Sequence, residues 1–304
     1  MSTCKCFAAV VLAVTIVQIL PAESHCPGNA ASVPLRLTNG HRMIVAVSIN
    51  HSGPYNFLLD TGTQVTMLDP SLAAELHLNT QGSAAVAGPG FNAAASIAQV
   101  DLLEAGLHSV AKQKVLVFGL QHPHPVDLQF RGVLGEDFLS NFDMLIDNAH
   151  GLLCLDNSGA MRADVKGPHI ALQATAQTRS DGLLCKSLIL LARLPDGMRP
   201  IRLMLDSGTN VSFLFDTSRY MPVKFLRNTS LAGAGIDGAQ RRYAALPVDN
   251  LQIGPLEILG VSFYTVSGDN KDSSPAEFDG MLPTGLFRSV FVCHTDHFVV
   301  LEPR

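Results

Sequence analysis

Short apolar runs alternate along this chain with clusters of Gly, Pro, Asn and Asp, and long helical periodicities are absent. This pattern predicts a mostly β protein with a few short helices. Residues 33–39 and 43–49 should form two paired strands. Asn39-Gly40 lies between them, and Asn-Gly is the strongest short signal for a β-hairpin turn.

The remaining elements follow the same alternation. Residues 71–76 should form a short helix with Asp69 as its N-cap and Pro70 at its first position. Residues 132–140 should run from a strand end into a second short helix. The last strand reaches almost to the C-terminus, so we expect it to be paired in a sheet. Further expected strands lie at 55–59, 99–104, 113–118, 144–146, 152–155, 169–175, 183–194, 291–293 and 298–301.

One sequence motif occurs twice in the chain. Residues 56–68 read NFLLDTGTQVTML and residues 202–214 read RLMLDSGTNVSFL, which places Asp60 and Asp206 206 − 60 = 146 positions apart. Three further landmarks repeat in the same order with offsets of 145 to 148, as the starts of the pairs show (231 − 86, 248 − 100 and 280 − 132). So long a period indicates two similar domains and not a solenoid array.

The two aspartates are candidates for a shared catalytic centre. A single Asp-x-Gly would be read as an ordinary Asx turn, but two in register favour carboxyl groups that meet. Two carboxyl groups within hydrogen-bond range share one proton and titrate in two separated steps. Such a pair contains a base and an acid at the same time.

The order of these motifs resembles the aspartic peptidases. Asp-Thr/Ser-Gly-Thr is followed by a glycine-rich hairpin and then by an apolar-apolar-Gly element before a short helix. The likeness is greatest to the retropepsin-like type, here fused into one chain as in pepsin, and covers about residues 33–304. It implies two homologous, closed-barrel-like lobes (25–160 and 161–304) that are related by a pseudo-twofold axis and separated by a cleft.

The resemblance also implies an aspartic-type endopeptidase that works as a monomer without cofactor or metal. Asp60 and Asp206 would activate a water molecule for hydrolysis of a peptide or protein bound in an extended conformation. Gly62 and Gly208 would permit the tight turns. Four hydroxyl residues would support the catalytic loops, either by hydrogen bonds between the halves or by donation to the outer carboxylate oxygens. The first role falls to Thr61 and Ser207, the second to Thr63 and Thr209.

Two glycine-rich stretches lie where the flaps of this family would cover the cleft. Val133-Leu134-Gly135 matches the element that supports the catalytic loop, whereas the second copy reads Met281-Leu282-Pro283. Proline lacks an N–H, so the packing below Asp206 should differ. The flap and substrate-binding candidates are Gly88, Gly90, Phe91, Gly233, Gly235 and Ile236.

Composition narrows the class of protein. The 304 residues are 47% apolar and 15% charged with a net charge of −5, which is typical of a globular protein. No basic cluster occurs, so nucleic acid is not an expected partner. The segment GAGIDG at 233–238 matches a dinucleotide fingerprint, but no helix pattern follows it, so a dinucleotide site is not expected.

The N-terminus has the pattern of a secretory signal peptide. Lys5 precedes the apolar run 7–20, and cleavage is expected near Ser24, which defines a signal peptide over 1–24 and a secreted or periplasmic protein. An uncleaved anchor is the alternative, although the run is shorter than the roughly 20 residues of a membrane-spanning helix. No membrane contact is expected beyond this peptide. Because no basic pro-segment follows, we expect activity without zymogen processing.

Four cysteines remain after the expected cleavage, which permits two disulfides in three connectivities or buried thiols. Cys154 and Cys185 flank the junction between the halves and are the favoured pair. His294 and His297 lie in an expected hairpin turn, and His122 and His124 lie in a Pro-rich loop. We predict that these histidines are solvent-exposed and not metal ligands.

Two other functions stay open at this point. A peptidase-like shell could bind peptides or a partner protein without cutting them, because Pro283 departs from the family pattern and the flaps have no clear counterpart of the pepsin tyrosine. A protease that processes itself or a single target would look the same in the sequence.

Overall fold

The computed structural model describes most of the chain after the predicted signal peptide. Several sequence predictions lie outside the described residues: the signal peptide, the turn at Asn39-Gly40, His122, His124 and three flap candidates (Gly90, Gly235 and Ile236). Within the described part, no helix is long and apolar enough to cross a membrane. The described residues are 26–38, 42–88, 91–120, 130–178, 181–195, 197, 199–215, 227–234, 238–266 and 277–304.

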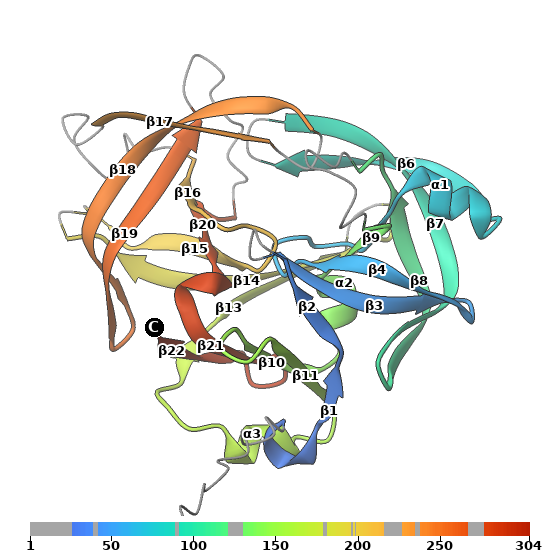
Figure 1. Ribbon diagram of the computed structural model, residues 1–304, viewed down its shortest axis with the longest axis horizontal. Helices are drawn as coiled ribbons and strands as arrows, with labels where there is room; N and C mark the ends of the chain where they lie inside the picture. Colours follow the sequence, from blue (N-terminus) through green and yellow to red (C-terminus); the bar gives the residue numbers. More distant parts are fainter. Residues whose placement is uncertain are drawn as a thin grey trace, which may run out of the picture.

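The protein is mostly β, as the alternation of short apolar runs predicts, and the strands of the described residues form three sheets. Two of these have eight strands, and each comes from one half of the sequence (Figure 1). The first sheet has the order β2 (Leu35–Leu37), β3 (Met43–Ile49), β4 (Ser52–Leu59), β9 (Gly132–Leu134), β5 (Met67–Leu68), β8 (His108–Val117), β7 (Phe91–Ala105) and β6 (Thr80–Gly88).

The second eight-stranded sheet repeats this order strand for strand. An additional pairing also recurs, β3 with β7 in the first sheet and β14 with β18 in the second. The strand order is β13 (Gln173–Thr178), β14 (Leu184–Arg193), β15 (Ile201–Asp206), β20 (Gly280–Pro283), β16 (Ser212–Leu214), β19 (Leu256–Val266), β18 (Gln240–Ile253) and β17 (Arg227–Ala234).

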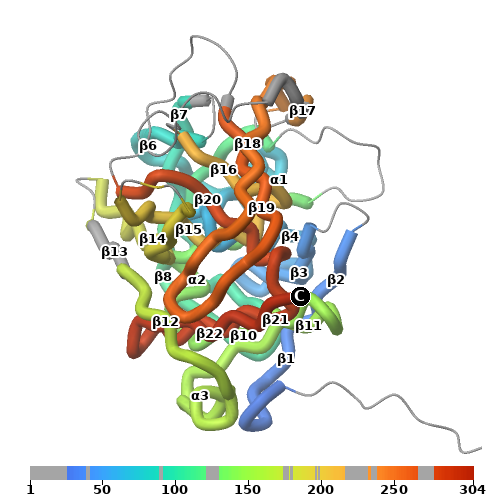
Figure 2. Tube along the Cα trace, turned by 90° about the vertical axis from the view of Figure 1, so that its left-hand side faces the viewer, coloured from blue at the N-terminus to red at the C-terminus, as the bar shows by residue number. Residues whose placement is uncertain are grey.

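A six-stranded sheet combines strands from both halves. Strand β10 of the first half pairs antiparallel with β21 of the second, with Met144 opposite Val292. Figure 2 shows this sheet running across the molecule with helix α3 (Ala160–Asp164) beneath it. The strand order is β1 (Ala31–Val33), β11 (Leu152–Asp156), β10 (Asp143–Asp147), β21 (Phe287–Cys293), β22 (Phe298–Pro303) and β12 (Ile170–Ala171).

Helices are few and short, as expected. Helix α1 (Pro70–Glu75) begins as predicted, because the Asp69 carboxylate accepts a hydrogen bond from the backbone N–H of Ser71. Helix α2 (Glu136–Leu139) directly follows β9. Two 3-10 turns, η1 (Pro27–Asn29) and η5 (Thr284–Leu286), complete the helical elements of the described residues.

The largest hydrophobic core joins all three sheets. Phe57 from the first sheet, Phe263 from the second and Phe287 from the six-stranded sheet are all fully buried in this one cluster. Complete burial of such a side chain contributes about 1.5–3 kcal/mol to the free energy of unfolding. The two halves are therefore held together by apolar packing as well as by backbone pairing.

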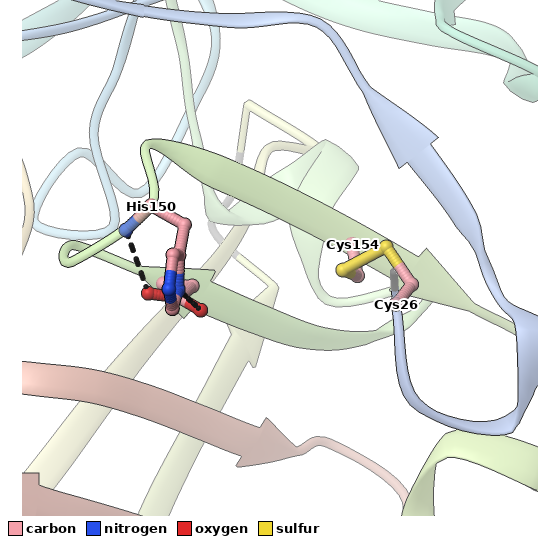
Figure 3. The surroundings of a disulfide bond; sticks show 4 residues. Cys26, His150 and Cys154 are labelled. Carbon is pink, nitrogen blue, oxygen red and sulfur yellow. Dashed lines mark hydrogen bonds and ion pairs between the residues drawn. A yellow bond between two sulfur atoms is a disulfide. The ribbon is translucent and has the colours of Figure 1, made fainter. Parts of the chain in front are cut away.

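Two predictions outside the paired aspartates are wrong. The disulfide joins Cys26 to Cys154, with a Cα–Cα distance of 5.7 Å, and not Cys154 to Cys185 (Figure 3). Strand β1 pairs with β11, with Ser32 opposite Cys154, so the segment before β1 returns past β11 and brings Cys26 to it. Cys185 lies on β14, in another sheet, and is a buried thiol.

The predicted exposure of His294 is also wrong, because its side chain is only 9% exposed. It follows strand β21 and packs against helix α2 of the other half, with its Nε2 3.1 Å from the Glu136 carboxylate. His297, three residues later, is exposed as predicted.

Candidate active site

Each aspartate lies at the buried end of a strand and is held by the backbone of the turn that follows. Asp60 follows β4, and its Oδ1 accepts hydrogen bonds from the N–H groups of Gly62 (2.9 Å) and Thr63 (3.1 Å). Asp206 ends β15, and its Oδ1 accepts from Gly208 (2.7 Å) and Thr209 (3.2 Å). The turns thus hold both carboxylates in the same way, as the repeated motif suggests.

Thr61 and Ser207 interlock the two turns by four hydrogen bonds. The backbone N–H of Thr61 donates to Ser207 Oγ (3.0 Å), and that of Ser207 donates to Thr61 Oγ1 (3.0 Å). Each hydroxyl then donates to a carbonyl of the opposite strand, Thr61 to Leu205 and Ser207 to Leu59, both at 2.9 Å. Each hydroxyl group both donates and accepts a hydrogen bond across the pair, so the two turns are fixed against each other.

The interlock brings the two carboxyl groups together across two glycines. An ideal Cβ on Gly62 would lie 2.5 Å from Cγ of Asp206, and one on Gly208 would lie 2.4 Å from Cγ of Asp60. Real Cβ atoms do not approach other atoms so closely, and only glycine fits at either position. Asp60 is 9% exposed and Asp206 only 2% exposed, so the pair is nearly removed from solvent.

Burial raises the pKa of both carboxyl groups, but by unequal amounts. For Asp206, burial and the negative charge of Asp60 raise the pKa well above its ordinary value, and the hydrogen bond with Asp60 raises it further. For Asp60, burial also raises the pKa, but hydrogen bonds from Thr63, Asp206 and Gly62 oppose the rise. These directions favour protonation of Asp206 over that of Asp60.

Thr63 and Thr209 account for part of this difference. Thr63 Oγ1 donates to Asp60 Oδ2 at 2.8 Å, as the sequence comparison of the two turns suggests. The prediction for Thr209 is wrong, because its Oγ1 donates to the carbonyl of Val211 at 3.2 Å within its own turn. Among the described residues, a side-chain hydroxyl therefore donates to Asp60 and none donates to Asp206, which favours the ionised form of Asp60.

The elements below the two turns also differ. In the first half, the Asp60 N–H donates to the Leu134 carbonyl (3.1 Å), and the Gly135 N–H donates to Thr66 Oγ1 (3.1 Å). Pro283 occupies the position that corresponds to Gly135 and has no N–H to donate. It lies opposite Asp206 in the parallel pair β15–β20, so the strand pairing is retained.

Asp137 is a partly buried acid that sequence reasoning missed. Its Oδ1 accepts hydrogen bonds from the N–H (2.9 Å) and the Oγ1 (2.7 Å) of Thr66, and from the N–H of Phe138 (2.9 Å). Burial raises its pKa to about 6, although the bonds from Thr66 oppose the rise. The corresponding residue of the second half is Gly285, so this acid has no counterpart there.

The flap candidates within the described residues lie on hairpin strands. Gly88 is opposite Phe91 where β6 and β7 approach their connection. Gly233 lies on β17 opposite Arg241 of β18. Among the described residues, no group of three His, Cys, Asp or Glu side chains could hold a metal ion.

A mostly β fold that locks two Asp-Thr/Ser-Gly-Thr turns together is the arrangement expected of an aspartic peptidase. Residues 45–138, which include Asp60 and the elements from β3 to α2, match the family model of the aspartyl proteases. No match was found among curated proteins. The match spans 138 − 45 + 1 = 94 of the 304 residues, all in the first half of the chain, and supports an aspartic protease.

One solved structure similar to this chain is the crystal structure of a retropepsin-like aspartic protease from Rickettsia conorii. The two proteins share 19% sequence identity with a TM-score of 0.31. The similarity covers 41% of this chain and 90% of the other.

Proposed function

We propose that this protein is an aspartic endopeptidase that hydrolyses peptide bonds with Asp60 and Asp206 as its catalytic pair. The observation that carries the proposal is the close approach of the two carboxyl groups, which the Thr61–Ser207 hydrogen bonds enforce. The match of residues 45–138 to the aspartyl proteases supports the same activity.

In the proposed mechanism the two carboxyl groups have different roles. Asp60, charged and hydrogen-bonded by Thr63, accepts a proton from a water molecule, whose oxygen attacks the carbonyl carbon of the peptide. Asp206 donates its proton to the carbonyl oxygen, which gives a neutral tetrahedral diol. When the C–N bond breaks, the leaving nitrogen takes the proton from Asp60, and one hydroxyl proton of the diol returns to Asp206. The pair regains its starting state without a covalent intermediate.

We further propose that the two halves are homologous lobes with a substrate cleft between them. The matching strand orders of the two eight-stranded sheets support this proposal. An extended peptide would bind in the cleft by strand-like backbone hydrogen bonds to the β6–β7 and β17–β18 hairpins. The apolar run at residues 7–20 supports secretion or export to the periplasm, and the mature protein would act as a monomer.

The test is cleavage of casein and of a peptide library by the protein without residues 1–24, from pH 3 to pH 7. Wild type should cleave, pepstatin should inhibit, and Asp60→Asn should reduce kcat by at least about 10³-fold, because general base catalysis is lost. Asp101→Asn removes an exposed carboxylate on β7 and should leave kcat unchanged. Circular dichroism checks that each variant is folded.

A folded wild-type protein that cleaves nothing at any pH would refute the proposal. Binding of library peptides without cleavage would then favour a peptide-binding module. Full activity in Asp60→Asn would refute the assignment of the catalytic pair.

A further inference from the structure

A buried histidine–carboxylate pair connects the C-terminal hairpin with the first half of the chain. His294 follows β21, and its Nε2 lies 3.1 Å from Oε2 of Glu136, the first residue of α2. The His294 side chain is 9% exposed and the Glu136 side chain is completely buried. The two residues are 158 positions apart in the sequence.

Both ring nitrogens of His294 face acceptors. Nδ1 lies 2.6 Å from the carbonyl oxygen of Phe142, and Nε2 faces the carboxylate. A neutral imidazole has one N–H, so it can donate to only one of these two oxygens, whereas an imidazolium donates to both. Glu136 Oε1 has no hydrogen-bond partner among the described residues, so the Glu136 carboxylate depends on His294.

The His294–Glu136 pair lies next to the segment that supports the Asp60 turn, because Glu136 directly follows Gly135. The backbone N–H of Glu136 donates to the carbonyl of Thr63 at 2.9 Å. Thr63 in turn holds Asp60 through both its N–H and its Oγ1. A shift of Glu136 therefore moves the residue that stabilises the charge of Asp60.

We propose that His294 and Glu136 form a pH-dependent tie that positions the Asp60 turn, closed while His294 is protonated and weakened once His294 loses its proton. The consequence for catalysis rests on the proposed peptidase function, but the tie itself does not. His294 and Glu136 are positioning residues in this scheme, because they act on Asp60 through Thr63.

The charges around His294 favour its protonated form. Asp143 of β10 accepts a hydrogen bond from the His294 backbone N–H (3.1 Å) and forms an ion pair with Arg162 of α3 (2.9 Å). Arg162 also pairs with Asp296, in the same turn as His294 (2.6 Å). Burial lowers the pKa of His294, but the carboxylate of Glu136, the bonds to Glu136 and Phe142 and the charge of Asp143 outweigh it, so the pKa lies above its ordinary value.

A cavity beside the imidazole gives solvent protons access to His294. It has a volume of about 150 Å³, and its lining includes His294, Asp143, Arg162 and Asp156 of β11. His294 can therefore titrate in the folded protein without opening of the core around Glu136.

A similar tie, made by a side chain that does not titrate, secures the corresponding segment of the second half. Asn148, which follows β10, donates from its Nδ2 to the carbonyls of Thr284 (3.0 Å) and Phe287 (3.1 Å). Thr284 corresponds to Glu136 by the 148-residue offset. In both cases a side chain from one half of the sequence holds the segment that follows the supporting strand of the other half. An amide has no charge to lose, and only the tie on the Asp60 side responds to pH.

The first test follows the tie itself, by NMR and in the Asp60→Asn variant so that no self-cleavage occurs. The His294 ring should titrate above pH 6.5. As the ring loses its proton, hydrogen exchange of the Glu136 amide should become about tenfold faster relative to that of the Val133 amide, after correction for the intrinsic rates. A tenfold change is the effect expected from the loss of one hydrogen bond. Glu136→Gln should abolish this step and lower the pKa of His294. His297→Gln, which removes an exposed ring in the same turn, should change neither.

Titration of His294 below pH 6.5 in the parent protein would overturn the proposal, as would Glu136 amide protection that does not follow that titration. Both measurements need no engineered change at Glu136 or His294, so they decide the matter even if Glu136→Gln does not fold.

The second test uses peptide cleavage by the protein with Asp60 intact. The kcat should fall with rising pH at the pKa measured for His294, with KM nearly unchanged, and Glu136→Gln should move this fall to lower pH. If the fall of kcat at alkaline pH is the same in Glu136→Gln and His297→Gln, the proposed effect of the tie on catalysis is wrong. If wild type cleaves nothing, the proposed function fails, and the NMR experiment still decides whether the tie exists.

Discussion

Replacing Asp137 by Asn should stabilise the folded protein at neutral pH and leave its stability in acid nearly unchanged. Asp137 is partly buried, and its Oδ2 is a buried atom without a hydrogen-bond partner among the described residues. Burial raises the pKa of this carboxyl group from 3.8 to about 6, although Thr66 and Gln113 oppose the rise. Asparagine resembles the protonated acid, which the folded state prefers. It also keeps an oxygen that can accept the two hydrogen bonds from Thr66.

The magnitude follows from linkage between protonation and folding. The pKa of Asp137 is higher in the folded than in the unfolded protein, so its contribution to stability is fully present below pH 3.8 and is lost as the pH rises through about 6. Each pH unit between these values corresponds to 1.36 kcal/mol. The charged carboxylate therefore lowers the free energy of unfolding by up to about 3 kcal/mol at pH 7.5, and Asp137→Asn should recover up to this amount.

The assay is urea denaturation of parent and variant from pH 3 to pH 8. Far-UV circular dichroism is the appropriate probe, because the chain contains no Trp. All proteins should carry Asp60→Asn, which prevents self-cleavage and makes the titration of the catalytic pair common to parent and variant. Asp101→Asn, at an exposed position on β7, is the matched control for removal of a carboxylate and should change the free energy of unfolding little.

The expected curve is a difference near zero at pH 3 that grows between pH 4 and pH 6 and is constant above pH 7. A difference that is the same at every pH would show that Asp137 does not titrate near 6. An Asn variant that is less stable than its parent at pH 7.5 would show that the hydrogen bonds to the charged form outweigh the cost of burial. Either result would refute the reasoning.

Two further predictions concern the hydroxyl donor at Asp60 and the disulfide. Thr63→Val should move the acid limb of kcat/KM upward by about 1 pH unit, because a hydrogen bond to a charged group contributes about 1.5–3 kcal/mol, whereas Thr209→Val should move it little. Equal shifts in pH–rate profiles would contradict the inequality of the two carboxyl groups. Cys154→Ser opens a loop with a sequence separation of 128 and should lower the free energy of unfolding by up to about 5 kcal/mol. Cys185→Ser, a thiol outside any disulfide, should lower it less, and similar losses in urea denaturation would argue against a stabilising disulfide.

Local rules accounted for much of the fold. The Asp69-Pro70 start of α1 and the hairpin of β10 and β11 were predicted at nearly their observed positions, because caps and apolar alternation act over a few residues. The length of the β6–β7 hairpin was missed. Residues 82–98 are rich in Ala, Gly and Ser, which favour strands weakly, and their pairing comes from cross-strand packing.

The duplicated motif also located the two aspartates that meet in space, since only the internal repeat connects positions 146 residues apart. It did not reveal Thr209 turned toward Val211, the buried His294 or the Cys26–Cys154 bond. Each of these depends on which distant segment packs against the residue. For His294 that segment is helix α2, 158 residues earlier, and nothing near position 294 encodes it.

The pairing of β10 with β21 sets a limit on dividing this chain. Four residue pairs, from Met144–Val292 to Asp147–Ser289, join strands from opposite halves of the sequence. A fragment that ends before β21 would leave that edge of β10 with open backbone donors and acceptors, which attract any available strand. Separately expressed halves should therefore associate with each other or with copies of themselves, and neither should remain a well-behaved single molecule in solution.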